Sequence, residues 1–247
     1  MTAAPVARRV RAQGLFEARV MLRNGEQVLL TLVLPALLLV GLARTSVVPI
    51  DGASERIDLV APGVLALAVM STAFTGQAIG TAFDRRYGVL RLLATTPLGR
   101  GGLLAGKVLA VLAVIAVQVA VLGTLAAVLG WRPATAGLLP AVVAVAAGTA
   151  AFTALGLLLA GTVRAEGVLA GANLLWVLLV VGGGVVVPAS TLPAPLSDLA
   201  PLLPSGALGD AMRAALTDGA VDGVALVVLV VWAVAASAAV RRWFRWA

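Results

Sequence analysis

The chain of 247 residues contains no cysteine and no histidine, and Lys107 is its only lysine. Disulfides, thiolate nucleophiles, imidazole bases and the usual zinc sites are therefore excluded. Aspartate and glutamate together number only 11, and aromatic residues make up 4% of the chain. Because so few catalytic side chains are available, we expect a protein that is not an enzyme and that has no metal and no cofactor of its own.

Apolar side chains dominate what the sequence does contain. Apolar residues make up 61% and charged residues 12%, against roughly half and a quarter in soluble domains. They form long blocks separated by short polar stretches, which is typical of a protein that crosses the membrane several times. The net charge of +7 is distributed over separate loops, so it does not indicate a nucleic-acid-binding patch.

The apolar blocks predict an all-α membrane protein with six transmembrane helices in a single domain. The first span is short and is interrupted by Pro35, and no cleavable signal peptide is expected before it. We place the spans at residues 28–43, 59–82, 108–129, 138–163, 168–187 and 224–240.

The basic residues predict how these spans are oriented, because cytoplasmic loops are enriched in Arg and Lys. Fourteen of the 18 basic residues lie on the side that holds both ends of the chain, the loop 83–107 and Arg164. The other four lie on the opposite side. Both termini are therefore expected in the cytoplasm, which agrees with an even number of spans.

Segments outside the spans are expected to be partly helical. Residues 6–27 place several arginines on one side of a helix, which fits a cytoplasmic helix lying in the headgroup interface. Residues 188–223 contain five prolines yet stay apolar, which fits short re-entrant helices tucked into the outer leaflet before the last span. Residues 241–247 are expected to form a cytoplasmic tail.

The loop between the second and third spans has the most informative pattern. Phe83, Tyr87, Leu90 and Ala94 follow helical spacing, and Pro97 ends the helix because the residue before a proline disfavours helical conformation. The pattern predicts a short, charged, cytoplasmic helix over residues 83–97. Such a helix either lies on the lipid headgroups or offers a docking surface to a cytoplasmic partner.

The stretch GGLLAGK, residues 101–107, has the glycine and lysine spacing of a Walker A loop. However, Val108 stands where that loop needs a hydroxyl group for magnesium, and no strand precedes the stretch. Nucleotide binding is therefore not expected here. We instead expect the glycines to break one helix and start another, and Lys107 to snorkel toward the membrane interface.

Few polar side chains lie inside the predicted spans, chiefly Gln77, Gln118 and Asn173. They fit two interpretations, which are hydrogen bonds between helices and a place in a substrate pathway. No span contains a buried ionised pair, which argues against an ion-coupled carrier.

Two stretches resemble the ABC-2-type ABC transporter permeases, the membrane subunits of bacterial exporters such as the daunorubicin-resistance permeases. The family's pattern E-R-E-x-G … L-x-x-T-P-L … G-K is similar to Asp84-Arg85-Arg86-Tyr87-Gly88, Leu92-Leu93-Ala94-Thr95-Thr96-Pro97-Leu98 and Gly106-Lys107. Its pattern L-P … A-L … R before the last span is similar to Leu203-Pro204, Ala207-Leu208 and Met212-Arg213. The chain departs from the first pattern, with Asp84 for the usual Glu and Arg86 for the second acid.

The resemblance implies a permease subunit of an ATP-driven exporter, in which two copies or paralogues associate in the bacterial plasma membrane. A separate cytoplasmic ABC ATPase subunit would bind ATP and magnesium, and helix 83–97 would insert into it as a coupling helix. Membrane lipids are also expected partners, and nucleic acid is not. The residues implied in coupling to the ATPase are Asp84, Arg85, Arg86, Tyr87, Gly88, Leu90, Arg91 and Pro97.

The apolar composition favours an amphipathic, drug-like or lipid-like substrate. Two other functions are compatible with the sequence: a secondary transporter or channel working alone, and a membrane scaffold or assembly factor without transport activity. Co-purification with a soluble ATPase would separate the exporter subunit from both.

Overall fold

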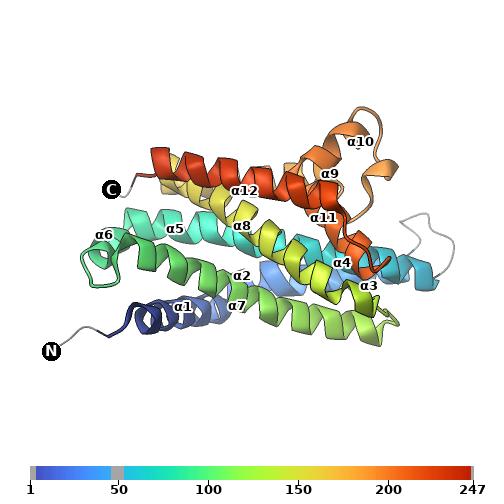
Figure 1. Ribbon diagram of the computed structural model, residues 1–247, viewed down its shortest axis with the longest axis horizontal. Helices are drawn as coiled ribbons and strands as arrows, with labels where there is room; N and C mark the ends of the chain where they lie inside the picture. The colour runs from blue at the N-terminus through green and yellow to red at the C-terminus, as the bar shows by residue number, and fades with distance from the viewer. Residues whose placement is uncertain (1–3, 46–52, 246–247) are drawn as a thin grey trace.

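The computed structural model describes residues 4–45 and 53–245 as a bundle of helices, the longest of which run along the long axis of the molecule (Figure 1). No strand occurs within these described residues. Helices pair their own backbone N–H and C=O groups, which is what a lipid environment requires. Among the described residues, five helices are long and apolar enough to cross a membrane: Arg56–Arg86, Gly101–Val128, Thr135–Thr162, Ala165–Gly183 and Gly223–Trp243.

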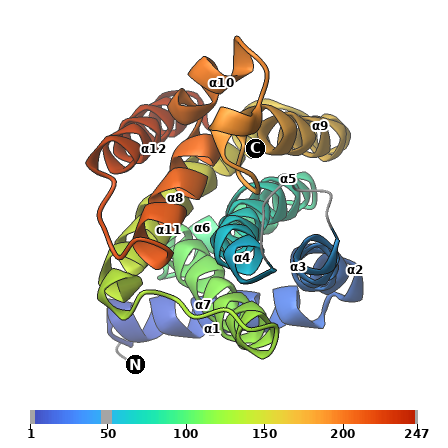
Figure 2. The ribbon, with the colours of Figure 1, turned by 90° about the vertical axis from the view of Figure 1, so that its right-hand side faces the viewer.

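The first of these five is a nearly continuous rod made of three segments. They are α4 (Ala53–Met70), the π-helical turn η2 (Ser71–Gly76) and α5 (Gln77–Arg86). Its most apolar stretch is 89% buried, whereas those of α9 (Ala165–Gly183) and α12 (Gly223–Trp243) are 17% buried. The α4–η2–α5 rod is therefore the core of the bundle, and α9 and α12 lie at its surface (Figure 2).

The other long helices pack around this rod. α7 (Gly99–Val128) contacts α4, and α8 (Leu138–Thr162) contacts the whole rod on one side and α12 on the other. The shorter elements are α1 (Val6–Arg23), α2 (Gly25–Val28), η1 (Leu29–Val33), α3 (Leu34–Arg44), α6 (Val89–Ala94), η3 (Thr135–Gly137), η4 (Ala189–Thr191), α10 (Leu196–Leu199), η5 (Ala200–Leu202) and α11 (Pro204–Leu216).

The prediction of six spans is confirmed only in part. The first predicted span, 28–43, corresponds to η1 and α3, which contain 5 and 11 residues. At 1.5 Å per residue this helix is about 24 Å long, shorter than the ~30 Å hydrocarbon core of a bilayer. The fifth predicted span, 168–187, is shifted, because α9 ends where Gly184 adopts the left-handed conformation.

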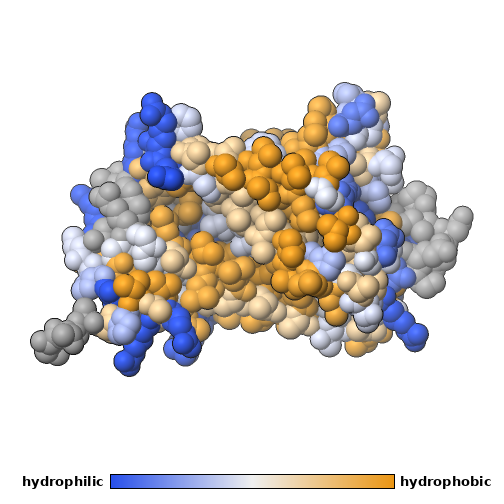
Figure 3. Space-filling view, viewed as in Figure 1, coloured by the Kyte–Doolittle hydropathy of each residue, from blue (hydrophilic) through white to orange (hydrophobic). Residues whose placement is uncertain are grey.

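The two ends of the bundle differ in charge. α1, α6 and the last turn of α12 lie at the same end (Figure 1). We call it the basic end, because the arginines of α1, of residues 85–91 and of α12 gather there. Figure 3 shows hydrophilic side chains at both ends and a band of apolar side chains between them. This distribution is that of a bundle embedded in a membrane.

The segment 188–223 contains short helices, and the longest of them, α11, packs against α4, α8 and α12. The buried guanidinium of Arg213 donates hydrogen bonds to the carbonyl oxygens of Val185, at 3.0 Å, and Gly184, at 3.1 Å. It also lies 2.7 Å from a carboxylate oxygen of Asp210. Arg213 thus supplies donors just past the C-terminus of α9. The burial of α11 fits the expected re-entrant helices, and their depth in a membrane stays a prediction.

Two glycines allow direct contact between backbones in the core. A Cβ atom on Gly63 of α4 would lie 2.5 Å from the carbonyl oxygen of Val186. A Cβ atom on Gly156 of α8 would lie 2.7 Å from the carbonyl oxygen of Phe74. Both distances are too short for a side chain, so small residues set how closely these segments approach.

We expect Gly63→Ala to destabilise the protein by about 1–3 kcal/mol, the usual penalty for overpacking a core. Gly80→Ala is the matched control, because a Cβ atom on Gly80 of α5 would meet no atom within 4 Å. Thermal unfolding of both variants in detergent measures the difference. Equal melting temperatures for the two variants would contradict the close contact of α4 with residues 185–186.

Candidate functional site

The segment predicted as one helix over residues 83–97 folds as two helices joined by a turn. α5 ends at Arg86, Gly88 has a φ of 74°, and α6 begins at Val89. The prediction of one continuous helix is therefore wrong. The left-handed conformation of Gly88 redirects the chain, and glycine adopts it without the steric penalty that a side chain carries. We call residues 83–98 the α5–α7 turn.

The change of direction decides which side chains of the α5–α7 turn face outward. Tyr87 is 72% exposed and its ring stacks on that of Phe83, with the centroids 6.1 Å apart. Leu92 is 68% exposed, whereas Leu90 is 1% exposed. Placing Leu90 on a docking face is therefore wrong, because helical spacing across Gly88 no longer defines one face. The most exposed of the large apolar side chains in the turn are Tyr87 and Leu92, and Val89 is 36% exposed.

The first arginines of the turn reach the connection between α8 and α9. Arg86 forms an ion pair with Glu166, which lies in the first turn of α9. Arg85 donates a 2.5 Å hydrogen bond to the carbonyl oxygen of Val163, just after α8. Arg91 is exposed. Of the three arginines, two therefore hold the α5–α7 turn against the bundle.

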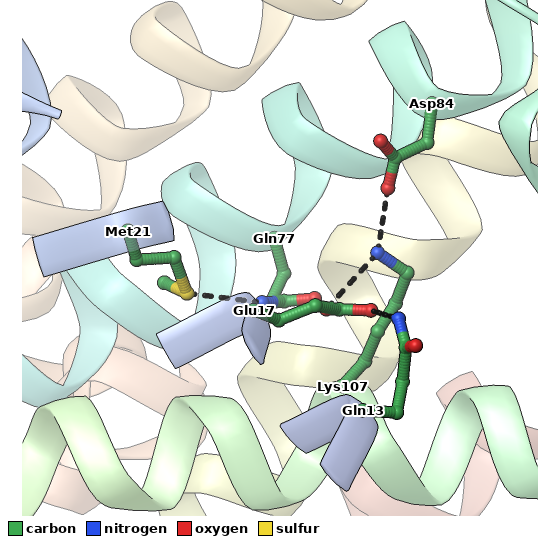
Figure 4. A network of polar contacts seen from close by, with 6 residues as sticks. All are labelled: Gln13, Glu17, Met21, Gln77, Asp84 and Lys107. Carbon is green, nitrogen blue, oxygen red and sulfur yellow. Dashed lines mark hydrogen bonds and ion pairs between the residues drawn. The ribbon is translucent and has the colours of Figure 1, made fainter. Parts of the chain in front are cut away.

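Lys107 lies in α7 and reaches both α1 and α5 (Figure 4). Its ammonium group lies 2.7 Å from Asp84 Oδ2 and 3.3 Å from Glu17 Oε2. The side chain of Lys107 is 5% exposed, that of Glu17 15% and that of Asp84 36%. Water screens this group of charges less than it screens surface ion pairs, so removing one partner is costly. We call Glu17, Asp84 and Lys107 the Lys107 clamp.

Two predictions about residues 101–107 are wrong. Lys107 does not snorkel, because its ammonium is buried between two carboxylates. The glycines do not break a helix, since α7 begins at Gly99 and runs through all of these residues. Gly106 instead permits close packing of α1 on α7, because a Cβ atom there would lie 2.8 Å from Cγ of Gln13. The stretch is helical, whereas the Walker A motif forms a loop.

Three residues of this site were not identified from the sequence. Glu17 and Glu166 accept the contacts of Lys107 and Arg86, and Arg9 of α1 donates a hydrogen bond to the carbonyl oxygen of Pro97. Only Glu17 gives a signal in the sequence, as the single acid in the otherwise basic helix α1. The partners of Arg9 and Arg86 lie 88 and 80 residues away along the chain, and no local pattern links them.

The polar residues predicted inside the spans lie in different surroundings. Gln118 is 2% exposed; it accepts a 2.9 Å hydrogen bond from Thr72 of η2 and donates a 2.7 Å bond to the carbonyl of Thr31 in η1. Gln77 is 4% exposed, and its amide nitrogen lies 4.0 Å from a methionine sulfur of α1. Asn173 is exposed on α9. Gln118 therefore forms hydrogen bonds between helices, and Asn173 faces outward.

These features first define a class of protein. Helices of spanning length and an apolar band between two polar ends make the chain a multi-pass membrane protein. Residues 48–240 match the family described as ABC-2 family transporter protein, and the chain belongs to that family. It is thus a membrane permease component of an ABC transporter, a class that works with an ATPase component. A comparison with curated proteins finds no match.

We expect Lys107→Met to destabilise the protein by about 2 kcal/mol, less than the roughly 3–5 kcal/mol lost when a fully buried pair is broken, because Asp84 is partly exposed. The substitution leaves the carboxylates of Glu17 and Asp84 without their shared cation. Lys107→Arg should retain most of the stability. Thermal unfolding in detergent measures these effects.

Arg91→Met is the control for this prediction, since it removes an exposed cation from the same end of the bundle. It should change stability by less than about 0.5 kcal/mol, as expected for a surface substitution. If Lys107→Met and Arg91→Met unfold at the same temperature, the Lys107 clamp does not stabilise the basic end.

Proposed function

We propose that the chain is the transmembrane subunit of an ATP-driven exporter and that the α5–α7 turn is where a separate cytoplasmic ATPase subunit docks. One observation carries this proposal: the turn exposes large apolar side chains and is at the same time firmly attached to the bundle. Tyr87 and Leu92 are 72% and 68% exposed. Side chains of this size and exposure, at the charged end of a membrane protein, fit a surface covered by a partner.

The contacts that attach the α5–α7 turn to the bundle would transmit a movement of the turn to the spans. Arg86 joins it to α9, Asp84 joins it through Lys107 to α7 and α1, and Arg9 of α1 holds the carbonyl of Pro97. Closure of the ATPase on nucleotide would displace the turn, and stiff helices would carry that displacement toward the opposite end. Substrate must bind differently to the two resulting states if transport is to be driven. ATP and magnesium stay on the ATPase, and this chain contributes no catalytic residue.

The charge difference between the two ends supports one orientation in the membrane. Arginines concentrate at the basic end, and cytoplasmic loops carry the excess of basic residues. The basic end, with both termini and the α5–α7 turn, therefore faces the cytoplasm of a bacterial cell in this proposal. An ATPase in the cytoplasm can then reach Tyr87 and Leu92.

A second permease copy, identical or related, is part of the same proposal. α9 is mostly uncovered, and Asn173 lies on its exposed side beside Leu174, which is 61% exposed. An amide in hydrocarbon finds few hydrogen-bond partners, and a neighbouring helix supplies them. The apolar faces of such a pair suit an amphipathic, drug-like or lipid-like substrate.

The alternative of a secondary transporter fits the structure less well. Coupling to an ion gradient generally uses charged or ion-coordinating groups near the middle of the membrane. The ion pairs described above lie toward the two ends of the bundle instead: Lys107 and Arg86 at the basic end and Arg213 at the opposite end. A scaffold without transport activity predicts no effect on an ATPase, so the following experiment also tests that alternative.

We expect Leu92→Asp and Tyr87→Ala each to weaken binding of the ATPase subunit about ten-fold or more, the effect of losing a central interface side chain. Transport and stimulation of ATP hydrolysis should fall with it. The measurement is co-purification and ATPase activity of the reconstituted pair. Melting temperatures of the permease should stay unchanged, because both side chains are exposed.

Val221→Asp is the control, since Val221 is 61% exposed just before α12, at the opposite end of the bundle. It introduces the same charge into a similarly exposed site away from the proposed docking surface. Unchanged ATPase binding in Leu92→Asp and Tyr87→Ala, or an equal loss in Val221→Asp, would refute docking at the α5–α7 turn.

A further inference from the structure

A hollow of about 350 Å³ opens at the basic end between the end of α8 and the last turn of α12. Arg242, Trp243 and Arg245 contribute to its lining together with Thr162 and Phe244. The described residues that line the hollow include no aspartate and no glutamate. Arg242 and Arg245 therefore line one concave surface whose described lining contains no carboxylate side chain, which favours an anionic ligand.

The chain after α12 folds back onto α8 and fixes the shape of this hollow. The backbone N–H of Arg245 donates a 3.1 Å hydrogen bond to the carbonyl oxygen of Gly161. The ring of Phe244 packs directly over Gly161, where a Cβ atom would lie only 2.3 Å from a ring carbon. Arg245 is thus held at the same hollow as Arg242 by two contacts to one residue of α8.

Arg242 lies on the same side of α12 as exposed valines. Arg242 follows Val231 by 11 residues and Val224 by 18, and at 100° per residue all three lie on one side of the helix. Val224 and Val231 are 75% and 60% exposed. α12 has 21 residues, which is about 31 Å of helix and matches the ~30 Å hydrocarbon core. Arg242 then lies at the level of the lipid headgroups.

The position of Trp243 is separate evidence that this end of α12 lies at the level of the lipid headgroups. Its side chain is 57% exposed and lines the hollow beside the two arginines. Tryptophan is enriched where hydrocarbon meets headgroups, because its ring is apolar and its N–H is polar. The apolar strip of α12 therefore leads to Arg242 and Trp243 in its last turn, and Arg245 follows just after the helix. Apolar groups thus precede the basic ones, as acyl chains precede the phosphate in a phospholipid.

We propose that this hollow binds the headgroup phosphate of an anionic phospholipid, with the acyl chains lying along the Val224 and Val231 face of α12. Guanidinium groups form paired, charge-assisted hydrogen bonds with phosphate oxygens. Basic pockets between membrane helices recognise anionic headgroups for this reason. Free phosphate has the same headgroup chemistry but gains nothing from the apolar strip. The site does not depend on the proposed export activity.

The test uses the purified full chain in detergent and three probes: phosphatidylglycerol, phosphatidylcholine with the same acyl chains, and inorganic phosphate. Native mass spectrometry measures binding of each lipid, and competition by inorganic phosphate is measured in the same way. Phosphatidylglycerol should bind most tightly. Arg242→Gln and Arg245→Gln should each lower its affinity about five-fold, the contribution of one basic residue near a membrane surface.

Arg241→Gln is the matched control, because Arg241 is exposed on the same turn of α12 but does not line the hollow. The affinity of Arg241→Gln for phosphatidylglycerol should equal that of the unchanged protein. Arg242→Lys should bind phosphatidylglycerol more tightly than Arg242→Gln does. Equal binding of the two lipids, or an equal loss in Arg241→Gln, overturns the site. Full competition by inorganic phosphate overturns the assignment to a lipid. Melting temperatures show whether a variant has lost its fold rather than its ligand.

Discussion

One buried ammonium group sets the arrangement of the basic end. Lys107 lies between carboxylates of α1 and α5, and three helices meet at its side chain. Lipid tails are as apolar as the helix surfaces they touch, so apolar contact alone gives little preference for one alignment of helices in a membrane. An ion pair with little exposure has a defined geometry, and it therefore fixes the alignment of α1, α5 and α7 from which the α5–α7 turn projects.

In the middle of the bundle, hydrogen bonds between neutral side chains fix the alignment of helices in the same way. Ser71 of η2 accepts a 2.8 Å hydrogen bond from the indole N–H of Trp176 on α9, and Gln118 of α7 joins η2 to η1. The π-helical turns are wider than α-helical ones and often mark functional sites. The core rod is thus irregular where side chains from α7 and α9 reach it and regular where it enters the α5–α7 turn.

Local patterns in the sequence were enough to predict the helical class, most of the spans and the basic end. Each of these features depends on residues that are close together in the sequence, namely an apolar block or a group of arginines. Contacts over long separations were not predictable in this way. Lys107 and Glu17 are 90 residues apart, and Lys107 next to an apolar run fits snorkelling equally well. The conformation of Gly88 was also not predicted. Because Gly88 is left-handed, the single helix expected here is two helices, and Leu90, which was expected at the surface, is buried.

The buried helix α11 has a consequence for how the protein is made. Its 13 residues are too few to be recognised as a span, which needs about 20, and the charge of Arg213 in its last turn further disfavours insertion of α11 alone. The partners that compensate this charge are carbonyls after α9 and Asp210. We therefore expect α11 to reach its buried position only after α4, α8, α9 and α12, the helices that surround it, have come together.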